Sequence, residues 1–136
     1  MIKVIMGKKG SGKTKQMIDM INSAVQTEHG NVVCIERGSK LTFDISHQIR
    51  LVESSEYDVN NYTALKGFIS GMYAGNYDIT HIFIDNLYKV TGKDDDSKAP
   101  AFLDKLSALS EQIGVNFTIT VSAPVEEATE GLKKYF

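Results

Sequence analysis

The chain has 136 residues, of which 42% are hydrophobic and 24% are charged, and these values are typical of a folded globular domain rather than a disordered or membrane-embedded chain. Its net charge of −2 argues against general nucleic-acid binding, which depends on neutralising phosphates. A single cysteine excludes an internal disulfide, and no apolar run reaches the length of a membrane span. We therefore expect one domain over residues 1–136, located in the cytoplasm.

A glycine-rich segment follows the first predicted strand, residues 2–6, and opens a predicted helix at 12–26. Residues 7–14 fit the phosphate-binding pattern G-x-x-x-x-G-K-[ST] at every fixed position. In such a loop, backbone N–H groups converge on a phosphate next to a helix N-terminus. The alternative is an ordinary glycine turn. We predict that Lys13 contacts the β and γ phosphates and that Thr14 binds Mg²⁺. The predicted nucleotide-binding residues are Gly7, Lys8, Lys9, Gly10, Ser11, Gly12, Lys13, Thr14 and Lys15.

Strands and helices alternate along the rest of the chain. Continuous apolar runs predict strands buried on both faces of a parallel sheet, and apolar residues at helical spacing predict the helices that cover it. Further strands are predicted at 32–35, 79–85 and 115–121, and an alternating segment at 45–51 predicts a strand near an edge. Further helices are predicted at 65–73 and 102–113, with a short acidic helix from Pro124. This order predicts an α/β three-layer sandwich, with a mostly parallel sheet of about five strands and helices on both faces.

Asp85 ends the apolar strand at 79–85, at the edge of the sheet where the glycine-rich loop also opens. We predict that it is the second protein ligand of Mg²⁺ and part of the catalytic site. The alternative is an aspartate that caps a turn after the strand. Asn86 stands where many P-loop ATPases carry a catalytic Glu, and an amide can orient a water molecule but cannot act as a base.

On these motifs the chain resembles the RecA-like branch of P-loop NTPases, and also small uncharacterised bacterial P-loop ATP-binding proteins. The resemblance implies the P-loop NTPase fold, with a catalytic Glu at the end of the strand after the phosphate-loop helix. Glu36 occupies that place, and residues 34–38 look similar to the Gly-Glu-Arg segment of the catalytic subunit of rotary ATP synthases. Glu36 is therefore predicted to be a general base or a water-orienting residue. The alternative is a surface carboxylate paired with Arg37.

The same resemblance implies a polar residue, at the end of a neighbouring strand, that senses the γ-phosphate. Thr120 or Ser122 would supply it. Alternatively, their hydroxyls cap the turn before Pro124. RecA-like sites often receive an arginine from a neighbouring subunit, a role open to Arg37 or Arg50 in a homo-oligomer.

Together these observations predict a Mg²⁺-dependent ATP-binding protein, an ATPase or ATP-driven switch that acts on a protein partner or within a homo-oligomer. Its cofactors would be ATP and Mg²⁺, and its catalytic residues Lys13, Glu36 and Asp85. A guanine-specificity motif is absent from the sequence, and neither nucleic acid nor a membrane is indicated as a partner. One alternative is a nucleotide sensor that does not hydrolyse ATP, motivated by Asn86. Another is a nucleoside-type small-molecule kinase, similar to thymidine kinases in phosphate loop and size.

Overall fold

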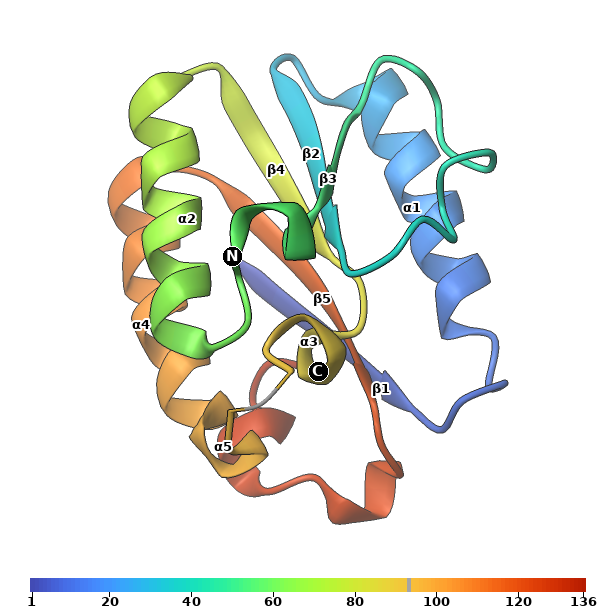
Figure 1. Ribbon diagram of the computed structural model, residues 1–136, viewed down its shortest axis with the longest axis vertical. Helices are drawn as coiled ribbons and strands as arrows, with labels where there is room; N and C mark the ends of the chain where they lie inside the picture. Colours follow the sequence, from blue (N-terminus) through green and yellow to red (C-terminus); the bar gives the residue numbers. More distant parts are fainter. Residues whose placement is uncertain (93) are drawn as a thin grey trace.

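The computed structural model describes residues 1–92 and 94–136, and its centre is a sheet of five parallel strands. The strands lie in the order β1-β5-β4-β2-β3, so β1 and β3 form the two edges (Figure 1). Their bounds are β1 (Ile2–Gly7), β2 (Asn31–Glu36), β3 (Arg50–Glu53), β4 (Ile79–Ile84) and β5 (Asn116–Ser122). Because all five are parallel, their carboxyl ends meet at one edge of the sheet.

Helices cover both faces of the sheet, which confirms the predicted α/β three-layer arrangement (Figure 1). The long helices are α1 (Lys13–Thr27) on one face, and α2 (Tyr62–Gly75) and α4 (Ala99–Ile113) on the other. The described residues also form two short α-helices, α3 (Leu87–Val90) and α5 (Glu130–Lys133), and short 3₁₀ helices at Ser54–Tyr57, Asp96–Lys98 and Val125–Glu127. Within the described residues, none of these helices combines the length and apolar character needed to cross a bilayer.

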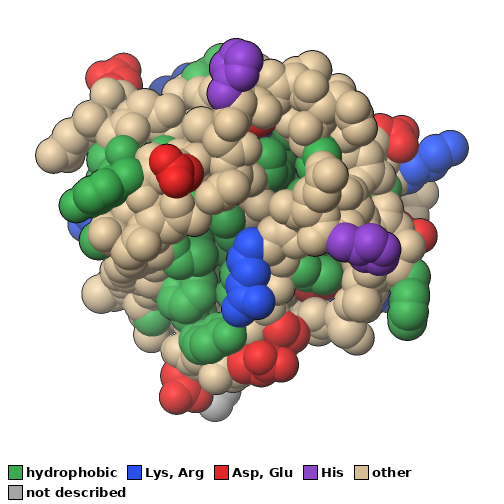
Figure 2. Space-filling model, turned by 90° about the horizontal axis from the view of Figure 1, so that it is seen from above, with side chains coloured by type: hydrophobic (Ala, Val, Ile, Leu, Met, Phe, Trp, Pro, Cys, Tyr) green, Lys and Arg blue, Asp and Glu red, His purple; other side chains and the backbone are tan. Residues whose placement is uncertain are grey.

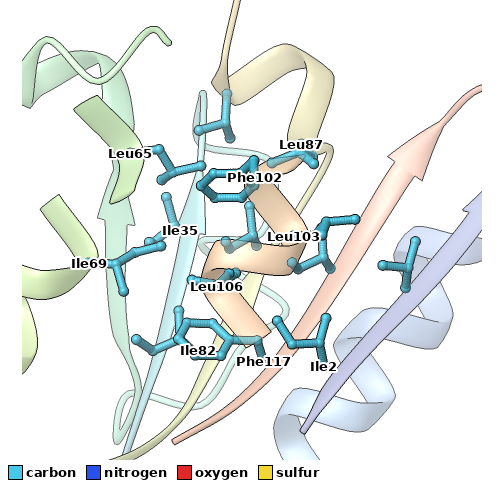
Figure 3. Close-up of a cluster of buried hydrophobic side chains, with 14 of the residues drawn as sticks. Ile2, Ile35, Leu65, Ile69, Ile82, Leu87, Phe102, Leu103, Leu106 and Phe117 are labelled. Atoms are coloured by element: carbon cyan, nitrogen blue, oxygen red, sulfur yellow. The ribbon is translucent and has the colours of Figure 1, made fainter. Parts of the chain in front are cut away.

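The larger part of the core lies between the sheet and the α2/α4 layer. Leu65 and Ile69 of α2 and Leu103 of α4 are fully buried, and they pack toward the sheet side chains Ile82 and Phe117 (Figure 3). A second cluster fills the space between the sheet and α1, and it includes Met17, Ile21, Cys34 and Phe83. Burial raises the pKa of the Cys34 thiol, so the group stays protonated and serves as a core side chain.

The predicted strand at 45–51 is wrong at its amino-terminal end. Residues 37–49 form turns and bends, and β3 begins only at Arg50. Ile45 and Ile49 are buried in the cluster beneath α1, so their alternation with polar residues reflects loop packing rather than a pleated strand. Asn22 of α1 holds this loop, because its side chain donates to the Asp44 carbonyl (3.1 Å) and accepts from the Ser46 N–H (3.2 Å).

The segment after Pro124 also differs from the prediction. A single turn of 3₁₀ helix covers Val125–Glu127, and the α-helix α5 follows only at Glu130. The other boundaries agree with the prediction within a few residues. Gly114 ends α4 in the left-handed conformation (φ 71°), which glycine adopts without strain.

His81 predicts a pH dependence of folding. Its ring is largely buried and stacks on the ring of Phe83, with the two centroids 4.1 Å apart. In the neutral form of His81, Nδ1 donates to the Glu28 carboxylate and Nε2 accepts from the Thr118 hydroxyl, both at 2.9 Å. Burial lowers the pKa of His81 more than Glu28 raises it. A histidine whose pKa is lowered by folding binds protons more readily when unfolded, so the free energy of unfolding should decrease as the pH falls below about 6.5.

Urea unfolding at pH 7.5, 6.5 and 5.5 measures this effect, which is limited to about 1.4 kcal/mol per pH unit for one proton. His81→Gln should reduce the slope, whereas His47→Gln, which changes an exposed side chain, should leave it unchanged. Equal slopes in wild type and His81→Gln would contradict the prediction.

Candidate functional site

The glycine-rich loop connects the carboxyl end of β1 to the first residue of α1. Gly10 and Gly12 have φ angles of 85° and 87°, a left-handed conformation that glycine adopts without strain. The Ser11 N–H donates to the Lys8 carbonyl at 3.1 Å, which closes a tight turn. Gly12 is the N-cap of α1 and has no side chain to occupy the helix terminus. The N–H groups of the first turn of α1 therefore remain available to an anion.

Lys13 folds back over this loop. Lys13 is the first residue of α1 and is almost fully buried (7% exposed). Its Nζ donates to the Lys8 carbonyl at 3.3 Å. An ammonium group has three donors, so a hydrogen bond to one carbonyl leaves capacity for an anionic ligand. The loop thus holds a buried positive charge beside the free N–H groups of a helix N-terminus.

Asp85 follows β4 at the same edge of the sheet. The side chain is largely buried (9% exposed), and its Oδ1 accepts a hydrogen bond from the Thr120 hydroxyl of β5 at 2.8 Å. The same Thr120 oxygen accepts from the Asn86 N–H at 2.7 Å, so one buried hydroxyl fixes both the carboxylate and the backbone that follows it. Within the described residues no hydrogen bond engages Oδ2, which leaves that oxygen for a cation.

A cavity of about 280 Å³ opens where the ends of β1, β2, β4 and β5 meet. Five basic side chains and two carboxylates contribute to its wall, and this excess of positive charge favours a polyanionic ligand. The basic residues are Lys9, Lys13, Arg37, Lys40 and Lys89, and the acidic residues are Glu36 and Asp85. Gly10, Thr14, Asn86 and Ser122 complete the lining.

The cavity brings together only part of the predicted nucleotide-binding set. Lys9, Gly10, Lys13 and Thr14 line it. The remaining loop residues Gly7, Lys8 and Ser11 line a neighbouring hollow of about 400 Å³ next to Val125, which Lys13 also lines. Lys15 is exposed on the first turn of α1 and lines neither space, and Gly12 contributes through its backbone as the N-cap.

The oxygen donors of the cavity suit a magnesium ion. Mg²⁺ prefers hard oxygen ligands and is commonly held by one or two carboxylates or hydroxyls together with ligand phosphates and water. Asp85 and Thr14 offer one carboxylate and one hydroxyl in the same cavity. Among the described residues, no group of three or more His, Cys, Asp or Glu side chains could hold a metal ion without such help.

Glu36 is buried at the carboxyl end of β2 (2% exposed), so the alternative of a surface carboxylate is wrong. Its Oε1 accepts from the Lys40 N–H at 3.0 Å and its Oε2 from the Leu41 N–H at 3.3 Å. Burial raises the pKa of Glu36; the Leu41 N–H lowers it, and the nearby Asp85 carboxylate raises it further. A raised pKa suits a general base, but the two backbone contacts also give Glu36 a structural role in holding the loop after β2.

Arg37 does not pair with Glu36. Its Nη1 donates to the Lys89 carbonyl at 3.4 Å, which joins the segment after β2 to the segment after β4. The two candidate γ-phosphate sensors are also separated: Thr120 is fully buried and hydrogen-bonded to Asp85, whereas Ser122 lines the cavity. Arg50 lines a groove beside α2, away from this cavity.

Sequence reasoning missed Lys40 and Lys89 as cavity residues. Lys40 lies four residues beyond Glu36, the last residue of β2, and Lys89 lies five residues beyond Ile84, the last residue of β4. A search for basic residues just after the carboxyl ends of predicted parallel strands would have found them, because that edge is where ligands bind in open α/β sheets.

A scan against models of known protein families gives no match to the chain, and a search of curated proteins gives none either.

Proposed function

We propose that this protein binds MgATP in the carboxyl-edge cavity and hydrolyses it, as an ATPase or ATP-driven switch of the RecA-like P-loop type. The observation that carries the proposal is the position of the buried Lys13, folded over a glycine-rich loop, in the same cavity as the Thr120-held Asp85. The loop and Lys13 would bind the phosphates, and Thr14 and Asp85 would hold Mg²⁺. The metal would neutralise charge on the β and γ phosphates.

Glu36 is the candidate for activating the attacking water. It lies in the same cavity, and its raised pKa brings the carboxylate nearer to the pH at which a base is most effective. Arg37, Lys40 and Lys89 would face charge that develops on the transferred phosphoryl group. Arg37 and Lys40, in the loop after β2, are hydrogen-bonded to Lys89 and Glu36 of the same cavity. Loss of the γ-phosphate from this cavity would therefore alter the conformation of that loop.

A nucleotide sensor is the second candidate. The favouring observation is that each Glu36 carboxylate oxygen already accepts a backbone N–H, while Asn86 is an amide. In a sensor, Glu36 would serve only to hold the loop after β2, and bound ATP would not be turned over.

Asp85→Asn tests the magnesium site. We expect wild type to bind ATP more tightly with Mg²⁺ than without it, and Asp85→Asn to lose most of this difference, since the amide removes the ligand charge. Equilibrium titration with a fluorescent ATP analogue, with and without Mg²⁺, measures both affinities. Asp19→Asn, which changes an exposed carboxylate on α1, is the matched control. Absence of ATP binding by wild type would refute the proposal.

Phosphate release from MgATP separates the two candidates. If Glu36 is the base, Glu36→Gln should bind ATP with little change and release phosphate at least 100-fold more slowly, a typical effect of losing general base catalysis. If wild type binds ATP but releases phosphate no faster than Glu36→Gln, the sensor is the better description. Thermal unfolding of each variant would verify that the loop after β2 remains folded.

A further inference from the structure

A groove of about 600 Å³ lies between α2 and the edge strand β3, on the face of the sheet opposite to α1. Its wall is mainly apolar, with a basic residue at the rim, and Figure 2 shows hydrophobic side chains gathered beside a basic side chain on this side of the molecule. The residues that matter here are Arg50, Val52, Phe68, Gly71 and Met72. β3 is short and forms one edge of the sheet, so this side of the groove lies at the sheet edge.

The glycines of α2 are not explained by packing within the chain. A methyl group on Gly67 or Gly71 would meet no atom within 4 Å, and neither has a left-handed φ angle. Glycine inside a helix is less stable than alanine, so the chain loses stability there without an internal benefit. Gly71 lines the groove, and its bare backbone lets another surface approach closely.

The chain also exposes a large apolar side chain. Phe43 is 95% exposed at the tip of the 37–49 loop, which we call the Phe43 loop. This loop is held in place from Glu36 and from Asn22 of α1, so Phe43 is presented on a backbone that is already ordered. An ordered loop loses less conformational entropy on binding than a flexible one.

Phe43 cannot enter the groove of its own chain. Leu41 and Ile45, on either side of it, are buried in the cluster beneath α1, whereas the groove lies on the α2 face (Figure 1). A second molecule can bring the two features together. The two features also carry opposite charges, because the acidic residue Asp44 follows Phe43 and the basic residue Arg50 borders the groove.

We propose that the chain self-associates by inserting Phe43 of one molecule into the α2/β3 groove of another, with Asp44 pairing with Arg50. The ring would pack against Phe68 and Met72 and approach the backbone at Gly71. Each molecule carries one Phe43 loop and one groove, so the contact joins different surfaces and can extend or close. The proposed contact does not involve a bound nucleotide, so self-association can be measured without ATP, whatever the outcome at the proposed ATP site.

Sedimentation equilibrium measures the association over protein concentrations up to about 1 mM, which detects even weak self-association. Wild type should show concentration-dependent self-association. Phe43→Ala should weaken it by about 30-fold or more, the loss typical of a central aromatic contact. A wild type that is monomeric at every concentration, or a Phe43→Ala variant that associates as well as wild type, would overturn the proposal.

Gly71→Leu and Gly67→Leu form a matched pair on one helix. Both replace a helix glycine by a good helix former, and the Cβ at either position would meet no atom within 4 Å, so we expect neither to lower stability. Of these two glycines, Gly71 lines the groove and Gly67 borders a different hollow. We expect Gly71→Leu to prevent self-association and Gly67→Leu to leave it unchanged. Equal effects of the two substitutions would count against the groove.

A mixing experiment identifies the occupant of the groove. Phe43→Ala retains a free groove and Gly71→Leu retains Phe43, so each variant alone should be monomeric and an equimolar mixture should form a 1:1 complex that does not grow. A mixture that stays monomeric would overturn the proposed contact between Phe43 and the groove. In an independent arm, Asp44→Arg and Arg50→Asp should each weaken association, and the double variant should recover it.

Discussion

Replacing Lys13 by alanine is expected to weaken MgATP binding by roughly a hundredfold or more, because removing one partner from a buried charge pair costs about 2–5 kcal/mol. Lys13 is 7% exposed and its Nζ lies 3.3 Å from the Lys8 carbonyl, so the ammonium is already positioned at the loop. Titration with a fluorescent ATP analogue in the presence of Mg²⁺ measures the change.

The control for this experiment is Lys3→Ala. Lys3 is an exposed residue of β1, the strand that leads into the loop, and it does not line the cavity. The control should bind ATP like wild type. If Lys13→Ala retained wild-type affinity while remaining folded, the glycine-rich loop would be only a structural turn.

Phe117→Ala should reduce the free energy of unfolding by about 3–5 kcal/mol, the usual cost of removing a buried phenyl ring. Phe117 is fully buried on the interior strand β5, and it pairs in register with Ile2 of β1 and Ile82 of β4 (Figure 3). No single neighbour can move to fill the space, because the strands on both sides are fixed by sheet hydrogen bonds. Urea unfolding monitored by circular dichroism measures the loss.

Phe43→Ala is the matched control for the core variant. The same ring is removed from a side chain that is 95% exposed, so the change in unfolding free energy should stay within about 0.5 kcal/mol. The experiment is done at low micromolar protein concentration, so that self-association does not contribute. Similar losses for both variants would contradict the assignment of Phe117 to the core.

Most elements of the fold could be predicted because their signals are local. The apolar runs that became β2 and β4, and the helical spacing of Leu65 and Ile69 in α2, reflect burial that repeats within a few residues. The prediction of a strand over 45–51 was wrong because the burial of this segment depends on a distant part of the chain. Its alternation resembles a strand, but Ile45 is buried by contact with distant α1, and nothing nearby in the sequence reveals that.

The part of the candidate site that could be predicted is the set of residues at the ends of predicted strands. Glu36 and Asp85 follow apolar runs, and parallel strands bring such ends to one edge, where the structure indeed places both in one cavity. The hydrogen bonds of Thr120 to Asp85 and Asn86 link positions 34 or 35 residues apart, and no spacing rule predicts such a contact. Nor did the pattern show that Glu36 contacts the Lys40 and Leu41 N–H groups.

By itself, the sequence determined the α/β class, the alternation of strands and helices, and the position of the glycine-rich loop between a strand and a helix. These features depend on side-chain periodicity and on glycine at defined positions, which are local properties of the chain. Only the tertiary structure decided that Thr120 holds Asp85, that Lys40 and Lys89 enter the cavity, and that Phe43 and the α2/β3 groove face away from each other. Each of these depends on strand order and on which face of the sheet a loop covers, and long-range packing sets both.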